Sequence, residues 1–353
     1  MKLHIALLPG DGIGEEIITQ AVKCVDATCR RFGHEVTYSR GLVGAAAIDA
    51  TGDPYPEATH RLCVEAGVVL FGAVGSPRYD NDPSARVRPE QGLLAMRGRL
   101  GLYANLRPVN IFPSLVARSP LRGELLEGVD ILCVRELTGG IYFGRPRGRS
   151  EDGETAYDTC VYTREEVRRV CALAFEQARR RRGRLTVVDK ANVLATSRLW
   201  RETAREMAPA YPDVTVEYMF VDNAAMQLVR QPAAFDVIVT ENLFGDILTD
   251  EAGAITGSLG LLPSASVGAG VSLFEPIHGS YPQAAGKDIA NPVATILSAA
   301  MMFEHAYHLH AEGAAIRRAV ATAIADGFVT EDISADGHAY GTRAVGSYIA
   351  GKI

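Results

Sequence analysis

The sequence predicts an α/β protein with two lobes, and three observations lead to this prediction. Short apolar runs alternate along the chain with segments of helical period. At 353 residues the chain is longer than a typical domain of roughly 100–200 residues, which favours two lobes. The composition, 47% hydrophobic and 22% charged, is that of a globular protein and excludes a wholly disordered, collagenous or coiled-coil chain.

The N-terminal part begins with an apolar run, 3–8, which we interpret as a buried strand. We expect the next elements in the order helix, strand, helix, strand, at about 14–32, 35–39, 56–66 and 68–74. The strands carry apolar residues along most of their length, which favours burial on both faces of a sheet. Pro9-Gly10 turns the chain directly after the first run, and no cleavage site follows, so we do not expect a signal peptide.

Four later runs predict further strands, each followed by a helix or a turn: VDILCVREL, RLTVVDK, VTVEYMFV and FDVIVT, at 129–137, 184–190, 214–221 and 235–240. From Asn291 to the end the apolar pattern is almost wholly helical. A helix over 165–182 ends in the basic run 179–182, where cations suit the negative end of the helix dipole. We prefer this solvated terminus to a nucleic-acid patch, because the chain has a net charge of −6.

One segment, 138–162, breaks the alternation because it is rich in Gly, Arg and acidic residues. Its ends alternate in polarity and could pair as strands, which favours a projecting hairpin, an arm that contacts another subunit. A plain surface loop is an equally good interpretation of the pattern.

The cellular compartment is predicted from two features, the length of the apolar stretches and the spacing of the cysteines. No apolar stretch approaches the roughly 18–20 residues of a membrane span. The six cysteines are scattered and form no C-x-x-C pair, so we expect reduced thiols and a cytoplasmic protein.

The Gly-rich turn Gly10-Asp11-Gly12-Ile13-Gly14 is partly similar to a dinucleotide-binding fingerprint. Its spacing is G-x-G-x-G rather than G-x-G-x-x-G, and Glu15 and Glu16 at the following helix start would repel a pyrophosphate. We therefore predict an ordinary strand-to-helix turn that could still line a ligand cleft, and no Rossmann site.

Arginines at the ends of elements indicate a site for anions. On a helix, Glu90, Leu93, Leu94 and Arg97 would share one face. Arg107 follows in ANLRPVNIF, Arg135 lies at the end of the predicted strand 129–137, and a guanidinium is a planar fork suited to carboxylates. Each arginine alone would be a surface ion-pair partner, but together with the leucine pair they suggest a dicarboxylate with an apolar branch.

A second cluster is acidic and suggests a cation. Asp246 and Asp250 are four residues apart, so on a helix they would project from one face, and Asp222 follows a predicted strand. All-oxygen ligands suit Mg²⁺ or Mn²⁺. The structural alternative is that Asp246 is only a helix N-cap.

Tyr142 and Lys190 are the candidates for proton transfer. Lys190 ends an apolar strand, where partial burial would favour a neutral amine usable as a base, and the Tyr142 phenol could act as an acid beside a cation. On their own, both would be assigned to structure, as a snorkelling lysine and a packing tyrosine.

Seven motifs in order give the chain an end-to-end resemblance to the isocitrate/isopropylmalate family of β-decarboxylating dehydrogenases, and within it to the isopropylmalate type of leucine biosynthesis. They are LLPGDGIGEE, RPEQGLLAMRGRLGLYANLRPV, VRELTGGIYFG, VDKANVL, VDNAAMQL, TENLFGDILTDEAG and EPIHGSYPQAAGKDIANP. The resemblance implies the two-lobed fold of that family, which is not a Rossmann fold, with a projecting β arm at about 138–162. Residues 1–103 and 257–353 would form a discontinuous cofactor-side lobe, and 104–256 a central lobe with the dimer interface.

The resemblance also implies roles. Arg97, Arg107 and Arg135 would bind the two substrate carboxylates, and Leu93, Leu94 and Val193 would contact an isopropyl branch, with Glu90 near the nicotinamide. Asp246 and Asp250 would bind Mg²⁺ or Mn²⁺ together with Asp222 of the partner subunit in a homodimer, and Lys190 would also cross the interface. Isocitrate is disfavoured, because GLLAMR offers apolar surface where its third carboxylate would need a polar partner.

The implied reaction has two stages. Lys190, positioned by Asp222, assists removal of the C2 hydroxyl proton while hydride leaves C2 for NAD, and loss of CO₂ from C3 follows. Tyr142 then protonates the enol, which gives 4-methyl-2-oxopentanoate from (2R,3S)-3-isopropylmalate.

The cofactor would lie against the loop His278-Gly279-Ser280 and Asn291. One departure concerns the adenosine ribose: many NAD-using members have an acidic residue where this chain has Gln283. The Lys-Tyr pair of NADP-using relatives is also missing nearby, so NAD remains the prediction.

Three alternatives stay open at this point. One is a tartrate- or malate-type dehydrogenase of the same family, and another is a non-catalytic regulatory subunit, which the complete set of Tyr142, Lys190 and the aspartates disfavours. The third is a Mg²⁺-dependent phosphohydrolase, which would act without nicotinamide.

Overall fold

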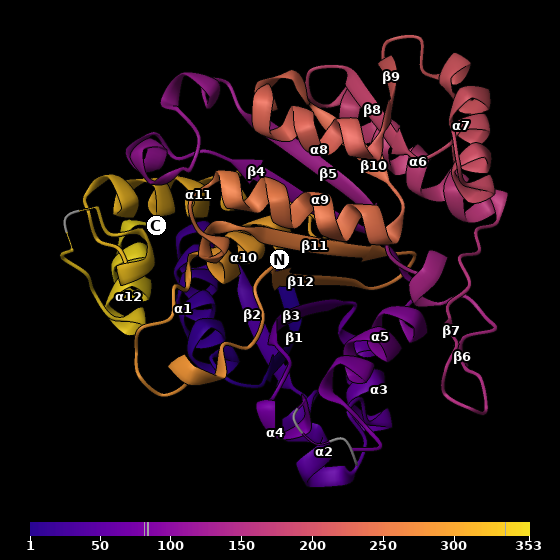
Figure 1. Cartoon of the computed structure of the whole chain (residues 1–353). Helices are drawn as coiled ribbons and strands as arrows, with labels where there is room; N and C mark the ends of the chain where they lie inside the picture. Colours follow the sequence, from indigo (N-terminus) through magenta and orange to yellow (C-terminus); the bar gives the residue numbers. More distant parts are fainter. Residues whose placement is uncertain (81, 83–84, 336) are drawn as a thin grey trace. The chain divides into compact units, whose positions relative to one another are not determined.

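A computed structural model of the chain describes residues 1–80, 82, 85–335 and 337–353, and these divide into two compact units (Figure 1). Unit 1 comprises Met1–Leu102, Phe112–Arg118 and Gly257–Ile353, and unit 2 comprises Tyr103–Ile111 and Ser119–Thr256. Unit 1 thus joins the two ends of the chain, while the middle forms unit 2. The functional labels of cofactor-side lobe and dimer-interface lobe stay predictions.

The sheet of unit 1 has the strand order β2-β1-β3-β12-β11. Its strands are β1 (Lys2–Gly10), β2 (Glu35–Arg40), β3 (Val68–Ala73), β11 (Pro263–Gly268) and β12 (Ser272–Pro276). β1 runs parallel to β2 and β3, β12 runs parallel to β3, and β11 is antiparallel to β12. Every residue of β3 is buried, because it has a strand on each side and helices pack against it, whereas the positions of β2 at the edge are exposed or half-buried.

Helices surround this sheet, and α10 is the central one. Val293 to Phe303 of α10 are all buried, because the helix packs against β11, β12, α1 and α11. The helices of unit 1 are α1 (Gly14–Phe32), α2 (Ala45–Thr51), α3 (Glu57–Ala66), α4 (Pro77–Asp80), α5 (Pro89–Arg99), α10 (Val293–His305), α11 (His310–Ala325) and α12 (Thr342–Lys352). Short 3₁₀ turns are η1 (Pro113–Arg118), η6 (Leu259–Leu261), η7 (Pro282–Ala284) and η8 (Glu331–Ile333).

The sheet of unit 2 has the order β4-β5-β10-β8-β9. Its strands are β4 (Leu102–Asn110), β5 (Asp130–Glu136), β8 (Arg184–Asp189), β9 (Thr215–Phe220) and β10 (Val237–Thr240). β4 is antiparallel to β5, and the other pairs are parallel. The register of the antiparallel pair sets Asn105 opposite Arg135 and Arg107 opposite Cys133.

The helices of unit 2 are α6 (Arg164–Arg179), α7 (Ala195–Met207), α8 (Val221–Arg230) and α9 (Asn242–Ile255), with 3₁₀ turns η2 (Gly123–Leu125), η3 (Gly140–Tyr142), η4 (Ala208–Ala210) and η5 (Pro232–Ala234). α6 begins at a capping box, in which Thr163 and Glu166 satisfy each other's backbone N–H. α9 packs on β5 and against η3, which places its first turns beside the end of the strand that carries Arg135.

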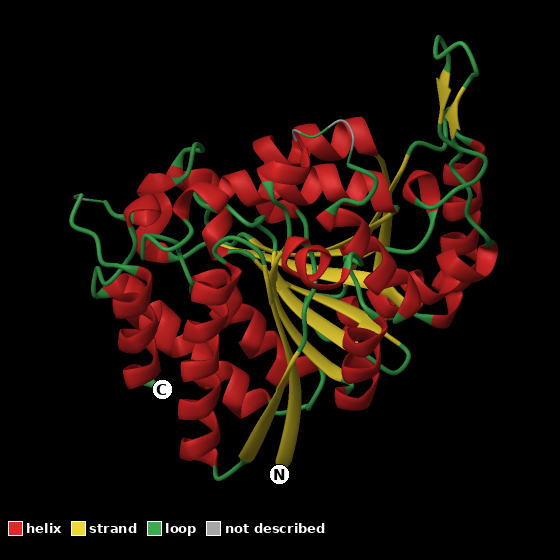
Figure 2. Ribbon diagram, turned by 90° about the horizontal axis from the view of Figure 1, so that it is seen from below, coloured by secondary structure: helices red, strands yellow, loops and turns green. Residues whose placement is uncertain are grey.

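The segment 138–162 contains a hairpin, which confirms the arm rather than a plain loop. β6 (Gly148–Arg149) and β7 (Ala156–Tyr157) pair antiparallel, and Figure 2 shows this hairpin standing away from the helices of unit 2. Its contact with another subunit stays a prediction.

The predicted strands and the helical C-terminal part are confirmed, with two corrections. Burial of both faces is wrong for β2, because it lies at a sheet edge and all of its positions are exposed or half-buried. Three strands were not predicted, namely β4, β11 and β12, because Pro, Ser, Asn and Gly interrupt their apolar pattern.

The basic run 179–182 is more than a solvated terminus. Arg181 Nε lies 2.9 Å from Asp236 Oδ1, and this carboxylate is buried at the start of β10. The run therefore anchors the end of α6 to the sheet by a charge-assisted contact.

Within the described residues, no helix is both long and apolar enough to cross a membrane. All six cysteines are free thiols, as predicted.

Candidate active site

The candidate site is built on two arginines of the unit 2 sheet. Arg107 on β4 and Arg135 on β5 come from neighbouring antiparallel strands, and their residues are only 6% and 2% exposed. Asn105 Oδ1 accepts a hydrogen bond of 2.6 Å from Arg107 Nε, which fixes the direction of that guanidinium. Buried guanidinium groups need acidic or polar partners, and α9 supplies them.

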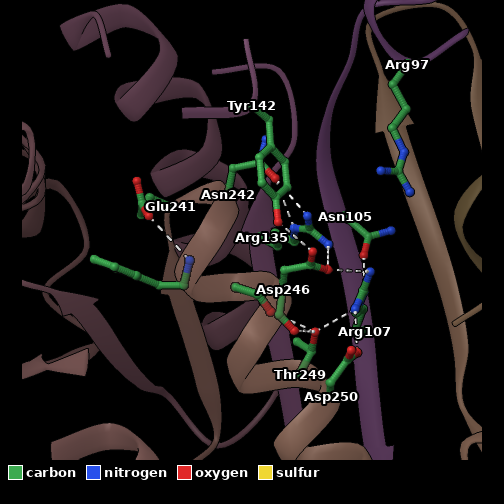
Figure 3. A network of polar contacts seen from close by, with 12 residues as sticks. Arg97, Asn105, Arg107, Arg135, Tyr142, Glu241, Asn242, Asp246, Thr249 and Asp250 are labelled. Atoms are coloured by element: carbon green, nitrogen blue, oxygen red, sulfur yellow. Dashed lines mark hydrogen bonds and ion pairs between the residues drawn. The ribbon is translucent and has the colours of Figure 1, made fainter. Parts of the chain in front are cut away.

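Asp246 and Asp250 lie on one face of α9, as their spacing predicted. Arg107 contacts both, at 3.7 Å to Asp246 Oδ1 and 3.5 Å to Asp250 Oδ1, and Arg135 Nη1 donates to Asp246 Oδ1 (Figure 3). Arg107 Nη1 also donates to Thr249 Oγ1 at 2.6 Å. Burial raises the pKa of Asp250, and the neighbouring Asp246 raises it further while Arg107 opposes both.

The Asp246 carboxylate is therefore a bridge between arginine and tyrosine and not an N-cap. Glu241 occupies the N-cap of α9, where its carboxylate accepts from the Phe244 N–H. Tyr142, at the end of η3, donates its hydroxyl hydrogen to Asp246 Oδ2 at 2.8 Å. Burial and this contact raise the pKa of Tyr142, so the phenol keeps its proton.

Two residues that the sequence reasoning missed hold Arg135 in place. Asn242 Oδ1 accepts from Arg135 Nε at 3.1 Å and from Nη2 at 2.9 Å. Gly245 faces the aliphatic part of the same arginine, and a Cβ there would lie 2.6 Å from Arg135 Cγ. Asn242 and Arg135 are 107 positions apart in the sequence, so local spacing cannot predict their contact. The sequence marks Asn242 and Gly245 only by their place in the motif TENLFGD.

Lys190 and Asp222 form a separate pair in unit 2. Lys190 Nζ lies 2.7 Å from Asp222 Oδ1, and this hydrogen bond lowers the pKa of Asp222. Both side chains keep contact with solvent, at 26% and 63% exposure, so the pair is open to a partner or ligand. Val193, three residues after Lys190, is 61% exposed.

Asp222 pairs with Lys190 and not with the aspartates of α9. Across the described ranges, no three His, Cys, Asp or Glu residues of one chain come close enough to hold a metal ion. One chain brings together Asp246 and Asp250, and the three-aspartate metal site with Asp222 of the partner subunit stays a prediction.

The predicted helix with Glu90, Leu93, Leu94 and Arg97 exists as α5 in unit 1. Arg97 Nη2 contacts Glu275 Oε1 at 3.3 Å, while its Nε is buried and has no hydrogen-bond partner among the residues that the structure describes. Leu93 packs on the core of unit 1 and is only partly buried, as is Leu94. Glu90 lies near Ser280, since a Cβ on Gly75 would be 3.2 Å from Glu90 Oε1 and 3.1 Å from Ser280 Oγ.

Unit 1 also contains a cavity of about 740 Å³. Its lining combines apolar, polar and acidic side chains, from Ile13, Ser258, Leu259, Gly260, His278, Gly279, Tyr281, Ile289, Ala290, Asn291, Glu331 and Asp332. Ile13 confirms that the first Gly-rich turn lines a cleft. Glu331 and Asp332 were not predicted, since nothing in the pattern of the sequence marks them.

The predicted cofactor residues reach this cavity unequally. His278, Gly279 and Asn291 line it, whereas Ser280 is buried and its carbonyl accepts from the Ile13 N–H at 2.9 Å. Gln283 is exposed and lies outside the lining. Burial lowers the pKa of His278, whose Nε2 is buried without a hydrogen-bond partner in the described part of the chain.

The chain thus combines an α/β fold with a cluster of two buried arginines, paired aspartates and a protonated tyrosine, and these features point to one class of dehydrogenase. A match to the model of the isocitrate/isopropylmalate dehydrogenase family covers residues 4–349. The chain belongs to this family, which confirms the resemblance and excludes a Rossmann fold.

Relatives across bacteria have closely similar sequences. A protein of Bacteroides fragilis named 3-isopropylmalate dehydrogenase is 58% identical over 100% of this chain and 99% of its own length. One of Geobacillus kaustophilus with the same name is 57% identical over 95% of this chain and 91% of its own length.

Solved structures agree on the fold. The crystal structure of isocitrate dehydrogenase from Methylococcus capsulatus has a TM-score of 0.88 and 37% identity, covering 99% of both chains. A β-decarboxylating dehydrogenase from Thermococcus kodakarensis has a TM-score of 0.80 and 36% identity, covering 99% of this chain and 96% of its own.

Proposed function

We propose that this chain catalyses the NAD- and metal-dependent oxidative decarboxylation of (2R,3S)-3-isopropylmalate to 4-methyl-2-oxopentanoate, a step of leucine biosynthesis. The observation that carries the proposal is the cluster in which Arg107 and Arg135 hold Asp246 beside the Tyr142 hydroxyl. Such a cluster offers cations for carboxylates, oxygens for a metal and a phenol for proton delivery. The full-length relatives named 3-isopropylmalate dehydrogenase support the substrate.

The arginines would bind the two substrate carboxylates. Arg107 and Arg135 are fixed by Asn105 and Asn242, so little rotamer freedom would be lost when a carboxylate binds. Arg97 would be the third, because its buried Nε has no acceptor among the described residues and a substrate carboxylate would supply one.

The donor set fits a hard divalent cation. Asp246 and Asp250 present carboxylate oxygens from one helix face, and Asp222 of the partner subunit would complete the set. When bound, Mg²⁺ or Mn²⁺ would polarise the C2 oxygen of the substrate. Two arginines beside the aspartates limit their mutual repulsion until then.

Lys190 and Tyr142 would move the protons. Asp222 holds Lys190 Nζ at 2.7 Å, which orients the amine that assists removal of the hydroxyl proton. Tyr142 keeps its proton and donates a hydrogen bond to Asp246 Oδ2, so the phenol would be available to protonate the enol.

The cavity of unit 1 fits the cofactor. Apolar side chains such as Ile13, Leu259 and Ile289 would cover a flat ring, and His278 Nε2 is a buried polar atom that a ligand would satisfy. NAD when bound would accept the hydride from C2. Among the described lining residues are two carboxylates, Glu331 and Asp332, and no Lys or Arg, a lining that favours NAD over a cofactor with an added 2′-phosphate.

The branch of the substrate would meet apolar side chains. Leu93 and Leu94 on α5 and the exposed Val193 would contact the isopropyl group, with Glu90 near the nicotinamide. A third carboxylate, as in isocitrate, would lose its hydration there without a polar partner.

Exposed apolar side chains on two helices support a homodimer. Met226 and Val229 on α8 and Ile247 on α9 are 54%, 43% and 58% exposed, and these two helices pack against each other. A second copy of the chain would cover them and bring its Lys190 and Asp222 to the site. A cytoplasmic location agrees with the free thiols and the pathway.

An initial-rate assay tests the proposal. We expect NADH formation with isopropylmalate and Mg²⁺ or Mn²⁺, much slower rates with NADP, and little turnover of isocitrate, malate or tartrate. Equal or better turnover of malate or tartrate would favour the related dehydrogenase, and a folded protein that binds ligands without turnover would favour the regulatory subunit.

A further inference from the structure

Asn242 contacts both functional ends of the unit 2 cluster. Its Oδ1 accepts two hydrogen bonds from Arg135, and its Nδ2 donates to Gly139 O at 3.2 Å. Gly139 starts the turn that ends in Tyr142. The oxygen of one buried amide therefore serves the substrate arginine, while its nitrogen serves the loop that carries the proton donor.

Asn242 makes a second contact that holds the loop before Tyr142, and this contact runs through Tyr162. The Asn242 backbone N–H donates to Tyr162 Oη at 3.0 Å. The Tyr162 ring packs against the glycines of the loop, since a Cβ at Gly139 would lie 2.6 Å from Tyr162 Cε1 and one at Gly140 would lie 2.3 Å from Tyr162 Oη. No side chain fits between them, so the loop, the Tyr162 ring and the Asn242 backbone are in direct contact.

The other side of the loop is tied to the strand of Arg135. The Glu136 carboxylate accepts from the Thr138 N–H at 2.9 Å and from the Gly139 N–H at 2.8 Å, and it is fully buried. The loop is thus held by β5 from its start and by α9 through Asn242. Asn242 is the anchor whose amide oxygen also holds the guanidinium of Arg135.

We propose that Asn242 is a positioning residue that sets the distance between the substrate carboxylate held by Arg135 and the proton donor Tyr142. The inference rests on the proposed function, from which it takes the roles of Arg135 and Tyr142. The amide does not reach the reacting atoms; it gives the arginine and the phenol one common anchor. A misplacement of about 1 Å between reacting groups lowers rates by about a hundredfold. An anchor that fixes this distance therefore contributes to the rate, although it requires a buried amide.

Asn242→Asp removes the hydrogen bond from Asn242 Nδ2 to Gly139 O and keeps an oxygen for Arg135. The aspartate keeps an oxygen for Arg135 and has the same volume, but it replaces the donor to Gly139 O by an acceptor. Asn105→Asp is the matched control, because Asn105 Oδ1 holds Arg107 on the neighbouring strand in the way that Asn242 Oδ1 holds Arg135. If the aspartate variant does not fold by circular dichroism, Asn242→Ala takes its place.

The kinetic test is a double-mutant cycle with Tyr142→Phe. We expect Asn242→Asp to lower kcat for isopropylmalate by about tenfold or more, with an unchanged KM for NAD. In the Tyr142→Phe background the same change should cost less than about twofold, because the loop no longer carries a proton donor. An equal factor in both backgrounds would overturn the proposal, as it would show a structural role independent of Tyr142. Asn105→Asp should show such an equal factor.

Hydrogen exchange gives a readout without turnover. In the full-length protein, amides of 138–144 should exchange faster in Asn242→Asp than in wild type, while α6 and the Asn105→Asp variant keep wild-type rates. Unchanged exchange of this loop would refute the grip of Asn242. If wild-type protein makes no NADH from isopropylmalate, the proposed function fails while the exchange result still decides whether Asn242 holds the loop.

Discussion

The two units prepare their sites in opposite ways. In unit 2 the charged groups already satisfy one another, since Arg107 and Arg135 contact aspartates of α9 and Tyr142 donates to Asp246. In unit 1 the buried Nε of Arg97 and Nε2 of His278 have no hydrogen-bond partner within the described chain. The first site is preassembled, and the second contains polar atoms that a ligand would satisfy.

Under the proposed function, this difference contrasts proton transfer in unit 2 with cofactor binding in unit 1. A preassembled cluster needs no reorganisation during reaction, so loss of its proton donor, the Tyr142 hydroxyl, should act on kcat. Unpartnered buried atoms carry a desolvation cost that a bound ligand removes, so changes in the cavity of unit 1 should act on KM for the cofactor.

The largest effect is expected at Lys190. Lys190→Ala should lower kcat about a thousandfold in steady-state assays, because it removes the amine that Asp222 orients. Lys190→Arg keeps the ion pair but not a usable base and should be nearly as inactive. Substantial activity in either folded variant would remove Lys190 from proton transfer.

Asp246→Asn should act next, through the metal. The lost carboxylate charge should weaken the apparent affinity for Mn²⁺ by about a hundredfold or more in a titration of activity. The matched control is Asp213→Asn, the same change at a surface aspartate that pairs with Arg179. An unchanged Mn²⁺ titration would contradict the role of Asp246 as a ligand.

In unit 1, His278→Ala should raise KM for NAD about tenfold and leave kcat near its wild-type value. The exposed His338 lies in the same unit outside the cavity lining, and His338→Ala should leave KM for NAD unchanged. A fall in kcat with constant KM would erase the contrast between the two units.

The smallest effect concerns pH and stability. Burial lowers the pKa of His278 in the folded protein, so the unfolded chain binds its proton first as the pH falls. This contribution to stability is complete above the unfolded value near 6.5 and is lost below it, with a slope of at most about 1.4 kcal/mol per pH unit. Urea unfolding at pH 7.5 and 5.5 should show a smaller loss for His278→Asn than for wild type; equal losses would contradict the assignment.

The sequence predicted the parts of the site that follow local spacing. Asp246 and Asp250 share a helix face because they are four residues apart, and Arg135 ends a strand that its apolar run reveals. Resemblance to the family supplied the roles of His278 and Asn291.

The sequence could not predict contacts between segments that are far apart along the chain. Asn242 and Gly245 hold Arg135 from another element, and nothing local in the pattern marks which side chain will face them. The strands β11 and β12 were missed for a related reason, since their burial comes from neighbours in the sheet and from α10 rather than from a continuous apolar run.

The discontinuity of unit 1 bears on how the chain is made. β3 pairs on one side with β1, but its other neighbour, β12, begins only at Ser272. During synthesis from the N-terminus, the residues of unit 2 leave the ribosome complete while β3 still lacks that neighbour. An apolar strand edge thus waits uncovered for most of translation, and the nascent chain is a candidate client for chaperones that shield such edges.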